Sequence, residues 1–197
     1  MKIYGTAKGG AISKKDFGVA FGGGAPSVDY SWVDVQSTYT IDGNKITRSG
    51  TGWDAYCLST NGSPASTGLT LSAITGGSAS SYVSYTWLDG SDNPRGKTSG
   101  NWDEQVMSYG WYFTNNPSED GAKIRIDGGT IGSPYAYTEN VTVFKVVMTA
   151  DDVKFYLDDV LKYTADSGTG EQPDASKTYY MIGSAYENDG YITGAMA

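Results

Sequence analysis

Apolar and polar residues alternate along the chain in short runs, and the clearest run is Asp151 to Ala165 (DDVKFYLDDVLKYTA). From Val153 to Leu157 every second residue is apolar, as in a strand with one buried side. The alternation stops at Asp158-Asp159 and a β-rich run resumes at Val160. Because an apolar stripe with a two-residue period does not line one face of a helix, the stretch predicts a β-hairpin with a two-residue acidic turn.

The same period, bounded by turn residues, predicts strands along the rest of the chain. Asp42-Gly43 and Gly128-Gly129 are further hairpin turns, and Asp-Gly is among the strongest hairpin signals. Short, regularly spaced strands without a convincing helix predict an all-β fold, a two-sheet antiparallel β-sandwich or jelly roll. The predicted strands are 28–35, 38–41, 45–48, 53–59, 69–74, 82–88, 106–114, 123–127, 130–131, 141–148, 153–157, 160–164, 178–184 and 191–193, with 141–148 the most apolar and expected near the centre of its sheet.

Composition agrees with this fold class and excludes several kinds of chemistry. The 197 residues suit one domain, and 27 Gly and 16 Tyr are typical of a β-protein with many turns. There is no histidine, which excludes Ser-His-Asp and Cys-His catalysis and His-ligated metals. The single cysteine, Cys57, excludes an intrachain disulfide and is expected to be a buried, inert thiol.

Charge and hydropathy restrict the partners. The net charge of −8 makes nucleic acid an unfavourable partner, because the protein would repel phosphate. No apolar run reaches membrane-spanning length, so we expect no membrane insertion. The start of the chain lacks the apolar core of a secretory signal peptide.

Residues 1–24 (MKIYGTAKGGAISKKDFGVAFGGG) differ from the rest, which we take as one jelly-roll domain over 25–197. The segment is rich in glycine and has four lysines against one aspartate. It is either a docking arm that orders on a partner or a first strand with a linker. The residues of a docking arm would be Lys2, Lys8, Lys14, Lys15, Phe17 and Phe21.

Five segments in a fixed order carry a family likeness: GTGWDAYCLST (50–60), SYVSYTWL (81–88), KIRIDGGTI (123–131), VKFYLDDVLKYT (153–164) and TYYMIGSAY (178–186). In this order they resemble the concanavalin A-like lectin/glucanase superfamily, especially laminin-G-like β-sandwich domains of viral and bacterial surface proteins. The turn of the fourth segment departs from that family, which usually has Asp-Gly or Asn-Gly where this chain has Asp158-Asp159.

The resemblance implies a jelly roll with one concave sheet that binds glycans on its surface or rim. It also implies that calcium is a possible cofactor. Some members of the family cleave glycans, and others are virion components. The lysine-bearing arm, with no signal peptide and no disulfide, favours a non-catalytic virion surface protein, most simply of a bacteriophage, that decorates a capsid or fibre. It would contact other virion proteins through the arm, and we expect it on the virion surface, or outside the cell after release.

Two alternatives stay open beside this reading: a free carbohydrate-binding module or lectin, and a glycan-cleaving enzyme. A homo-oligomer fits the first two readings, since weak binding at one site gains from multivalency. Glycoside hydrolysis needs two carboxylates about 5–10 Å apart. The acidic pairs Asp103-Glu104, Glu119-Asp120 and Asp158-Asp159 are adjacent in sequence and fit solvated turns or opposite strand faces better. We therefore predict no catalysis.

Two groups of residues are candidate ligand contacts. Asp89, Asp92 and Asn93, with Ser91, offer hard oxygen ligands for Ca²⁺ on one loop, and an Asx-rich turn explains the same residues. Aromatic rings stack on the C–H faces of sugars, and the aromatics in or beside predicted loops are the candidate glycan contacts. These are Trp102, Trp111, Tyr112, Tyr135 and Tyr137, whereas Trp32, Trp53 and Trp87 fall within strand patterns and are expected in the core.

Overall fold

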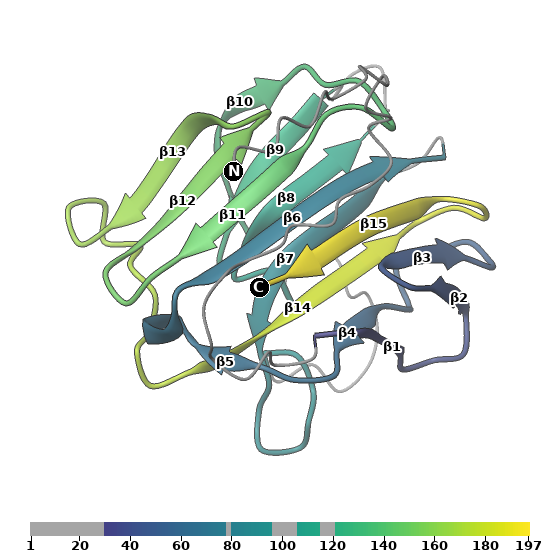
Figure 1. Ribbon diagram of the computed structural model, residues 1–197, viewed down its shortest axis with the longest axis horizontal. Helices are drawn as coiled ribbons and strands as arrows, with labels where there is room; N and C mark the ends of the chain where they lie inside the picture. Colours follow the sequence, from purple (N-terminus) through teal and green to yellow (C-terminus); the bar gives the residue numbers. More distant parts are fainter. Residues whose placement is uncertain (1–29, 78–79, 96–105, 115–120) are drawn as a thin grey trace, which may run out of the picture.

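The computed structural model describes residues 30–77, 80–95, 106–114 and 121–197, and these residues form two antiparallel sheets that lie face to face (Figure 1). This confirms the predicted two-sheet β-sandwich. The first sheet has eight strands in the order β1 (Trp32–Asp34), β4 (Cys57–Ser59), β14 (Thr178–Ala185), β7 (Ser81–Trp87), β8 (Tyr109–Thr114), β9 (Gly121–Ile126) and β10 (Gly129–Tyr135), with β5 (Ser63–Pro64) paired to β14. The second has seven, in the order β13 (Val160–Asp166), β12 (Asp152–Leu157), β11 (Phe144–Met148), β6 (Leu69–Gly76), β15 (Tyr191–Met196), β3 (Lys45–Arg48) and β2 (Tyr39–Asp42).

A short 3₁₀ turn, η1 (Ala65–Thr67), lies between β5 and β6. No helix in this part of the chain has the length and apolar character needed to cross a membrane.

The main core lies between the two sheets and is built by the alternation seen in the sequence. Val83 and Tyr85 of β7 face inward, and Val146 of β11 and Phe155 of β12 meet them from the other sheet as part of one buried cluster. Cys57 is part of this core, and burial raises the pKa of its thiol, which confirms the prediction of an inert buried cysteine.

The hairpin predicted from residues 151–165 is confirmed. β12 pairs with β13 around Asp158 and Asp159, both of which have left-handed backbone angles, φ +48° and +63°. Left-handed angles at both central residues are the geometry of a two-residue hairpin turn in which Asn-Gly and Asp-Gly are preferred. Asp158 compensates in part, since its Oδ1 accepts a hydrogen bond of 2.9 Å from the backbone N–H of Val143. Asp159 forms an ion pair with Lys145.

Several predicted strand boundaries differ from the structure. Of the predicted strand 53–59, only β4 pairs, because residues 50–56 form a loop instead. Residues 106–108 precede β8, and 141–143 precede β11. β11 is internal as predicted, while the middle position of the seven-stranded sheet belongs to β6. The residues proposed as a docking arm, together with all of 1–29, lie outside the described residues.

A second, smaller core lies on the outer side of the eight-stranded sheet, away from the seven-stranded one. Its buried members are Tyr56, Leu58, Tyr82, Val106, Met107 and Ile182. Tyr82 neighbours the inward-facing Val83 on β7 and therefore points to the opposite side of the sheet. The loops before β4 and before β8 supply the residues that cover this side, and the sequence analysis did not predict this layer.

The acidic turn gives a direct test of the hairpin. Asp159→Gly is expected to stabilise the protein by roughly 0.5 kcal/mol. Glycine removes a left-handed backbone penalty of about 1–2 kcal/mol, and part of this gain is offset by the greater entropy of the unfolded chain and by the loss of the exposed ion pair with Lys145. Asp158→Gly is the matched control and should gain less, since it also loses the hydrogen bond to Val143. Urea denaturation measures both, and a destabilised Asp159→Gly variant would contradict this account of the turn.

Candidate functional site

Four aromatic rings gather on the outer side of the eight-stranded sheet, and we call them the Trp53 cluster. The ring centroid of Trp53 lies 5.9 Å from that of Tyr82, 6.1 Å from Tyr112 and 5.2 Å from Tyr186. The tyrosines come from β7, from β8 and from the residue after β14, while Trp53 stands in the loop before β4. Trp53, Tyr112 and Tyr186 are half-buried, so the cluster combines packing with access to solvent.

The loop that carries Trp53 is shaped by glycine. Gly52 has φ +123°, a backbone conformation that residues with a side chain rarely adopt. A Cβ atom there would also lie 3.2 Å from Oδ1 of Asp54. The N–H of Gly52 donates a 2.7 Å hydrogen bond to the carbonyl of Tyr186, which ties the loop to the chain just after β14.

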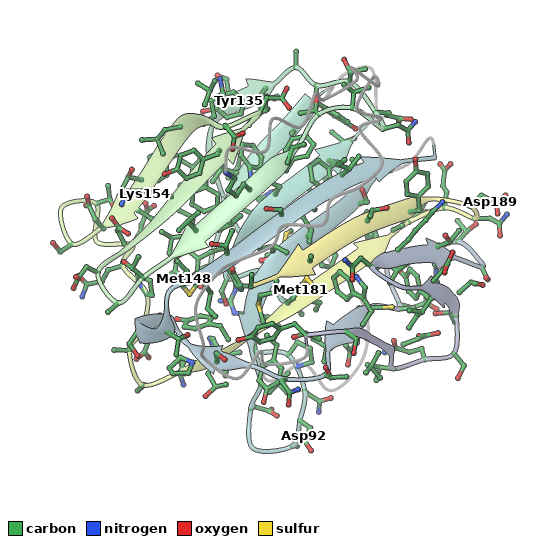
Figure 2. The ribbon with its side chains drawn as sticks, in the orientation of Figure 1. Asp92, Tyr135, Met148, Lys154, Met181 and Asp189 are labelled. Carbon is green, nitrogen blue, oxygen red and sulfur yellow. The ribbon has the colours of Figure 1, made fainter. Side chains whose placement is uncertain are left out.

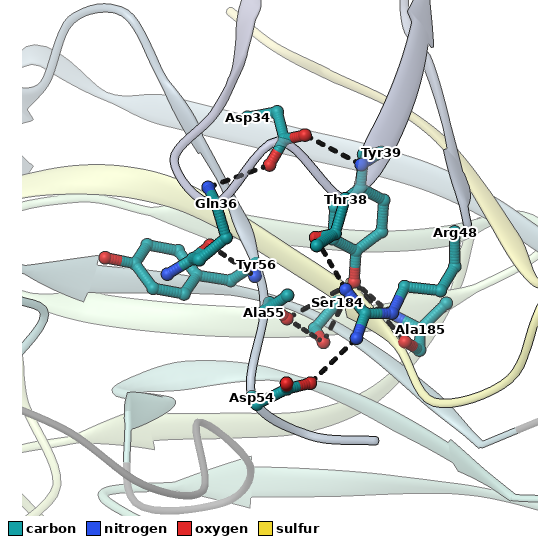
Figure 3. Close-up of polar contacts among 10 residues, drawn as sticks. All are labelled: Asp34, Gln36, Thr38, Tyr39, Arg48, Asp54, Ala55, Tyr56, Ser184 and Ala185. Atoms are coloured by element: carbon teal, nitrogen blue, oxygen red, sulfur yellow. Dashed lines mark hydrogen bonds and ion pairs between the residues drawn. The ribbon is translucent and has the colours of Figure 1, made fainter. Parts of the chain in front are cut away.

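A buried arginine holds the other side of this loop (Figure 3). Arg48 of β3 donates from Nη1 to Oγ1 of Thr38 over 2.6 Å, and from Nη2 to Oδ1 of Asp54 over 2.7 Å. Its guanidinium carbon lies 5.2 Å from the centroid of the Tyr39 ring. A buried charge is costly unless it is paired and hydrogen-bonded, so this ion pair constrains where Asp54, and with it the loop, can lie.

Further hydrogen bonds fix the end of the loop to β14 and to the segment between β1 and β2, as Figure 3 shows. The backbone N–H of Tyr56 donates to Oε1 of Gln36 over 3.1 Å, and Ser184 Oγ donates to the carbonyl of Ala55 over 2.7 Å. Asp34 in turn accepts from the N–H of Gln36 over 3.0 Å. The loop from 50 to 56 is therefore held from β3, from the segment between β1 and β2, and from β14.

The ion pair between Arg48 and Asp54 is asymmetric in its exposure. The side chain of Arg48 is 2% exposed, while that of Asp54 is 75% exposed. One carboxylate oxygen of Asp54 is bound to Arg48, and most of the side chain faces solvent. Because Asp54 directly follows Trp53, the same loop carries a half-buried aromatic ring and a carboxylate of fixed position.

The five aromatics predicted as glycan contacts do not gather at one place. Tyr112 belongs to the Trp53 cluster. The prediction for Trp111 is wrong, because its side chain is 0% exposed and packs between the sheets against Phe144 and Phe155. Its position in β8, hydrogen-bonded to a strand on each side, places alternate residues inward.

The remaining predicted aromatics lie elsewhere. Tyr135 and Tyr137 are half-buried and pack against the main core, with centroid distances of 5.8 Å from Tyr135 to Trp111 and 5.9 Å from Tyr137 to Phe113. Tyr135 lies at the far end of the molecule from the loop that carries Asp92 (Figure 2). Trp102 lies outside the described residues.

Trp53 and Asp54 are not among the site residues predicted from the sequence. Trp53 is predicted in the core within a strand, whereas it lies in a loop and packs half-buried against the second core. The expectation for Trp32 is confirmed, because it is buried, and Trp87 packs half-buried against the main core. The signal for Trp53 is present in the segment Gly50-Thr51-Gly52-Trp53-Asp54. Two glycines in three residues favour a loop over a strand interior.

The loop with Asp89, Asp92 and Asn93 is organised as an Asx-rich turn. Oδ1 of Asp89 accepts hydrogen bonds from the N–H and Oγ of Ser91, both 2.8 Å, and from the N–H of Asn93 over 3.1 Å. These bonds, above all the one from the Ser91 N–H, lower the pKa of the Asp89 carboxyl. Within the described ranges no three Asp, Glu, His or Cys side chains gather to hold a metal ion. Calcium at this loop stays a prediction.

The acidic pairs considered for catalysis are turn residues or lie outside the described part. Asp158 and Asp159 form the β12–β13 turn, where each binds a different partner. Asp103-Glu104 and Glu119-Asp120 lie outside the described residues.

No family model and no curated protein matches the chain. Solved structures do resemble it in fold. The exoplasmic/lumenal domain of VIP36 in its Ca²⁺/Man3GlcNAc-bound form has a TM-score of 0.56 at 12% identity, over 87% of this chain and 83% of that one. The Emp47p carbohydrate recognition domain has a TM-score of 0.53 at 10% identity, over 84% and 86%. The SPRY domain of human HERC1 has a TM-score of 0.51 at 12% identity, over 81% and 92%.

At these identities the likeness shows the fold alone. It agrees with the predicted two-sheet β-sandwich.

The asymmetric ion pair predicts unequal costs for removing its two members. Asp54→Ala leaves the buried Arg48 charge without its carboxylate, and we expect a loss of roughly 2–4 kcal/mol in the free energy of unfolding, short of the about 3–5 kcal/mol of a fully buried pair. Arg48→Met leaves Asp54 solvated and should cost about 1–2 kcal/mol, in line with two lost hydrogen bonds. Chemical denaturation compares them, and a larger loss for Arg48→Met would contradict the role given to burial.

Proposed function

We propose that this protein is a non-catalytic glycan-binding domain whose binding site is the Trp53 cluster with Asp54. The observation that carries the proposal is one loop with two neighbouring residues, the half-buried Trp53 and Asp54, whose 75% exposed side chain is anchored to a buried arginine. Sugars offer two kinds of surface, apolar C–H faces and hydroxyl groups, and the site has a partner for each.

The chemistry of the site suits a pyranose ring. The face of Trp53 takes the C–H side of the sugar, with Tyr186 and Tyr112 around it. Asp54 accepts hydrogen bonds from sugar hydroxyls, and bonds to an ionised acceptor are roughly twice as strong as neutral ones. Since Arg48 and Ser184 already hold the loop, little ordering entropy remains to be lost on binding.

The solved structures support the proposal by analogy. VIP36 is described with bound Man3GlcNAc, and the Emp47p domain is described as a carbohydrate recognition domain. The same VIP36 structure is also described as Ca²⁺-bound, and we therefore include calcium as a proposed cofactor. The SPRY domain of human HERC1 has a similar fold without a sugar in its description, so the site residues have to carry the assignment.

Where the domain works is a further part of the proposal. The four lysines and the glycines of residues 1–24 suit attachment to a larger particle, and we propose a virion surface, most simply that of a bacteriophage, as that particle. Deleting residues 1–24 should then abolish incorporation into particles while the glycan affinity of the domain is kept. A deletion variant that still incorporates would instead favour a free carbohydrate-binding module.

The binding site is tested by a matched pair of aromatic substitutions. Trp53→Ala should weaken binding to the best glycan of a multivalent array by about tenfold or more, equivalent to about 1.4 kcal/mol. Tyr156→Ala removes a half-buried aromatic from the outer face of the seven-stranded sheet and should leave binding unchanged. Equal losses in both variants, or no loss in either, would contradict the assignment of the site.

The same array serves two further checks. Running it with calcium and again with EDTA decides whether the metal contributes, and loss of binding in EDTA would support a calcium-dependent site. Assaying the bound glycan for newly released reducing ends checks the absence of catalysis, and steady release over time would show an enzyme.

A further inference from the structure

The charge that the loop of Trp53 presents to solvent is negative, because Asp54 of the ion pair is exposed and Arg48 is buried. Arg48 is buried under the loop, with a side-chain exposure of 2%, and both of its terminal nitrogens are hydrogen-bonded. Its positive charge balances Asp54 but cannot contact a ligand directly. A molecule that reaches this loop from solvent can therefore contact the carboxylate but not the guanidinium.

The exposed charged residues that follow β14 are negative as well. Glu187 follows Tyr186 directly and is exposed, and Asp189, in the turn between β14 and β15, is exposed as well. Figure 2 shows Asp189 at the edge of the molecule, at the tip of this turn. On the side of Trp53 that the loop and this turn supply, the exposed ionised groups in the described residues are acidic.

Two cations lie on the other side of Tyr112, and neither reverses the polarity at Trp53. Arg125 has its guanidinium carbon 5.1 Å from the centroid of the Tyr112 ring, but it is 7% exposed and donates to the carbonyl of Gly128. Lys123 is opposite Tyr112 on β9, one strand further from Trp53, and it is half-buried with a partner of its own.

We infer that the site selects uncharged glycans and rejects those that carry carboxylate, sulfate or phosphate groups, with Asp54 as the residue that sets this specificity. The inference rests on the proposed function and adds the class of ligand to it. An anionic sugar would have to bring its charge next to a carboxylate that Arg48 holds in place, and like charges placed together suppress the wrong partner. Neutral hydroxyls meet the same carboxylate as hydrogen-bond donors.

The test uses the full chain and pairs of oligosaccharides that share a backbone. Each neutral glycan, drawn from mannose-, galactose- and glucose-based series, is compared with a version that bears one uronic acid or one sulfate. Affinities are measured by biolayer interferometry on multivalent surfaces at low salt. The ratio of neutral to anionic affinity should be about tenfold or more at low ionic strength, and it should fall towards one near 1 M salt, where the screening length is about 3 Å.

The charge of Asp54 is then removed without removing its acceptor oxygen. Asp54→Asn should bring the ratio to one or below, because the amide can still accept from Arg48 but no longer repels an anion, and the Arg48 charge is then unbalanced. Asp151→Asn makes the same charge change at an exposed position in the turn between β11 and β12, and it should leave the ratio as it is. If the Asp54 variant folds poorly, the salt dependence of the unmodified protein still tests whether the preference is electrostatic, and a ratio that does not change with salt would overturn it.

The outcomes distinguish a failure of glycan binding from a failure of the specificity for uncharged glycans. If no glycan binds, the proposed function fails. If neutral glycans bind and their anionic versions bind equally well or better at low salt, the function stands and the specificity is overturned. A ratio that changes as much in Asp151→Asn as in Asp54→Asn would overturn the role of Asp54, because net charge alone would then explain the preference.

Discussion

The burial of one guanidinium, that of Arg48, is the constraint on which the candidate site depends. Removing such a group from water is costly, and the cost is recovered only if hydrogen-bonding partners stay within reach. Thr38 and Asp54 are those partners, over 2.6 and 2.7 Å, and Asp54 sits in the loop that carries Trp53. Many side chains stabilise the sandwich, whereas the ion pair with Arg48 constrains the position of this loop.

The fixed loop in turn gives the eight-stranded sheet a second packed layer. Tyr56 from the end of the loop packs with Tyr82 and Ile182 on the side of the sheet that faces away from the main core. A protein that only needed a stable sandwich could leave that side polar. Here Trp53 packs against this layer. The burial of aromatic rings in the layer therefore also holds in place the ring that we assign to ligand binding.

The sequence was informative where structure is decided locally and less so where distant segments meet. The hairpin of β12 and β13 was predictable because its period and turn lie within 15 consecutive residues. Trp111 is a predicted glycan contact because it lies beside a loop in the sequence, yet pairing on both sides of β8 buries it. Trp53 is predicted in the core, whereas the structure places it half-buried on the second core. Its loop is held by Arg48, which is close in the chain, and by Ser184, 129 residues from its partner Ala55.

The central claim is that Trp53 is the contact point for a neutral glycan, and NMR of the tryptophan indole N–H groups tests it most directly. The chain has five tryptophans, so the spectrum is simple. Titration with a neutral oligosaccharide should shift the indole signal of Trp53 most, while the signals of the buried Trp32 and Trp111 stay in place. If the Trp53 signal stays in place while backbone signals on the outer face of the seven-stranded sheet move, the account of the site is wrong.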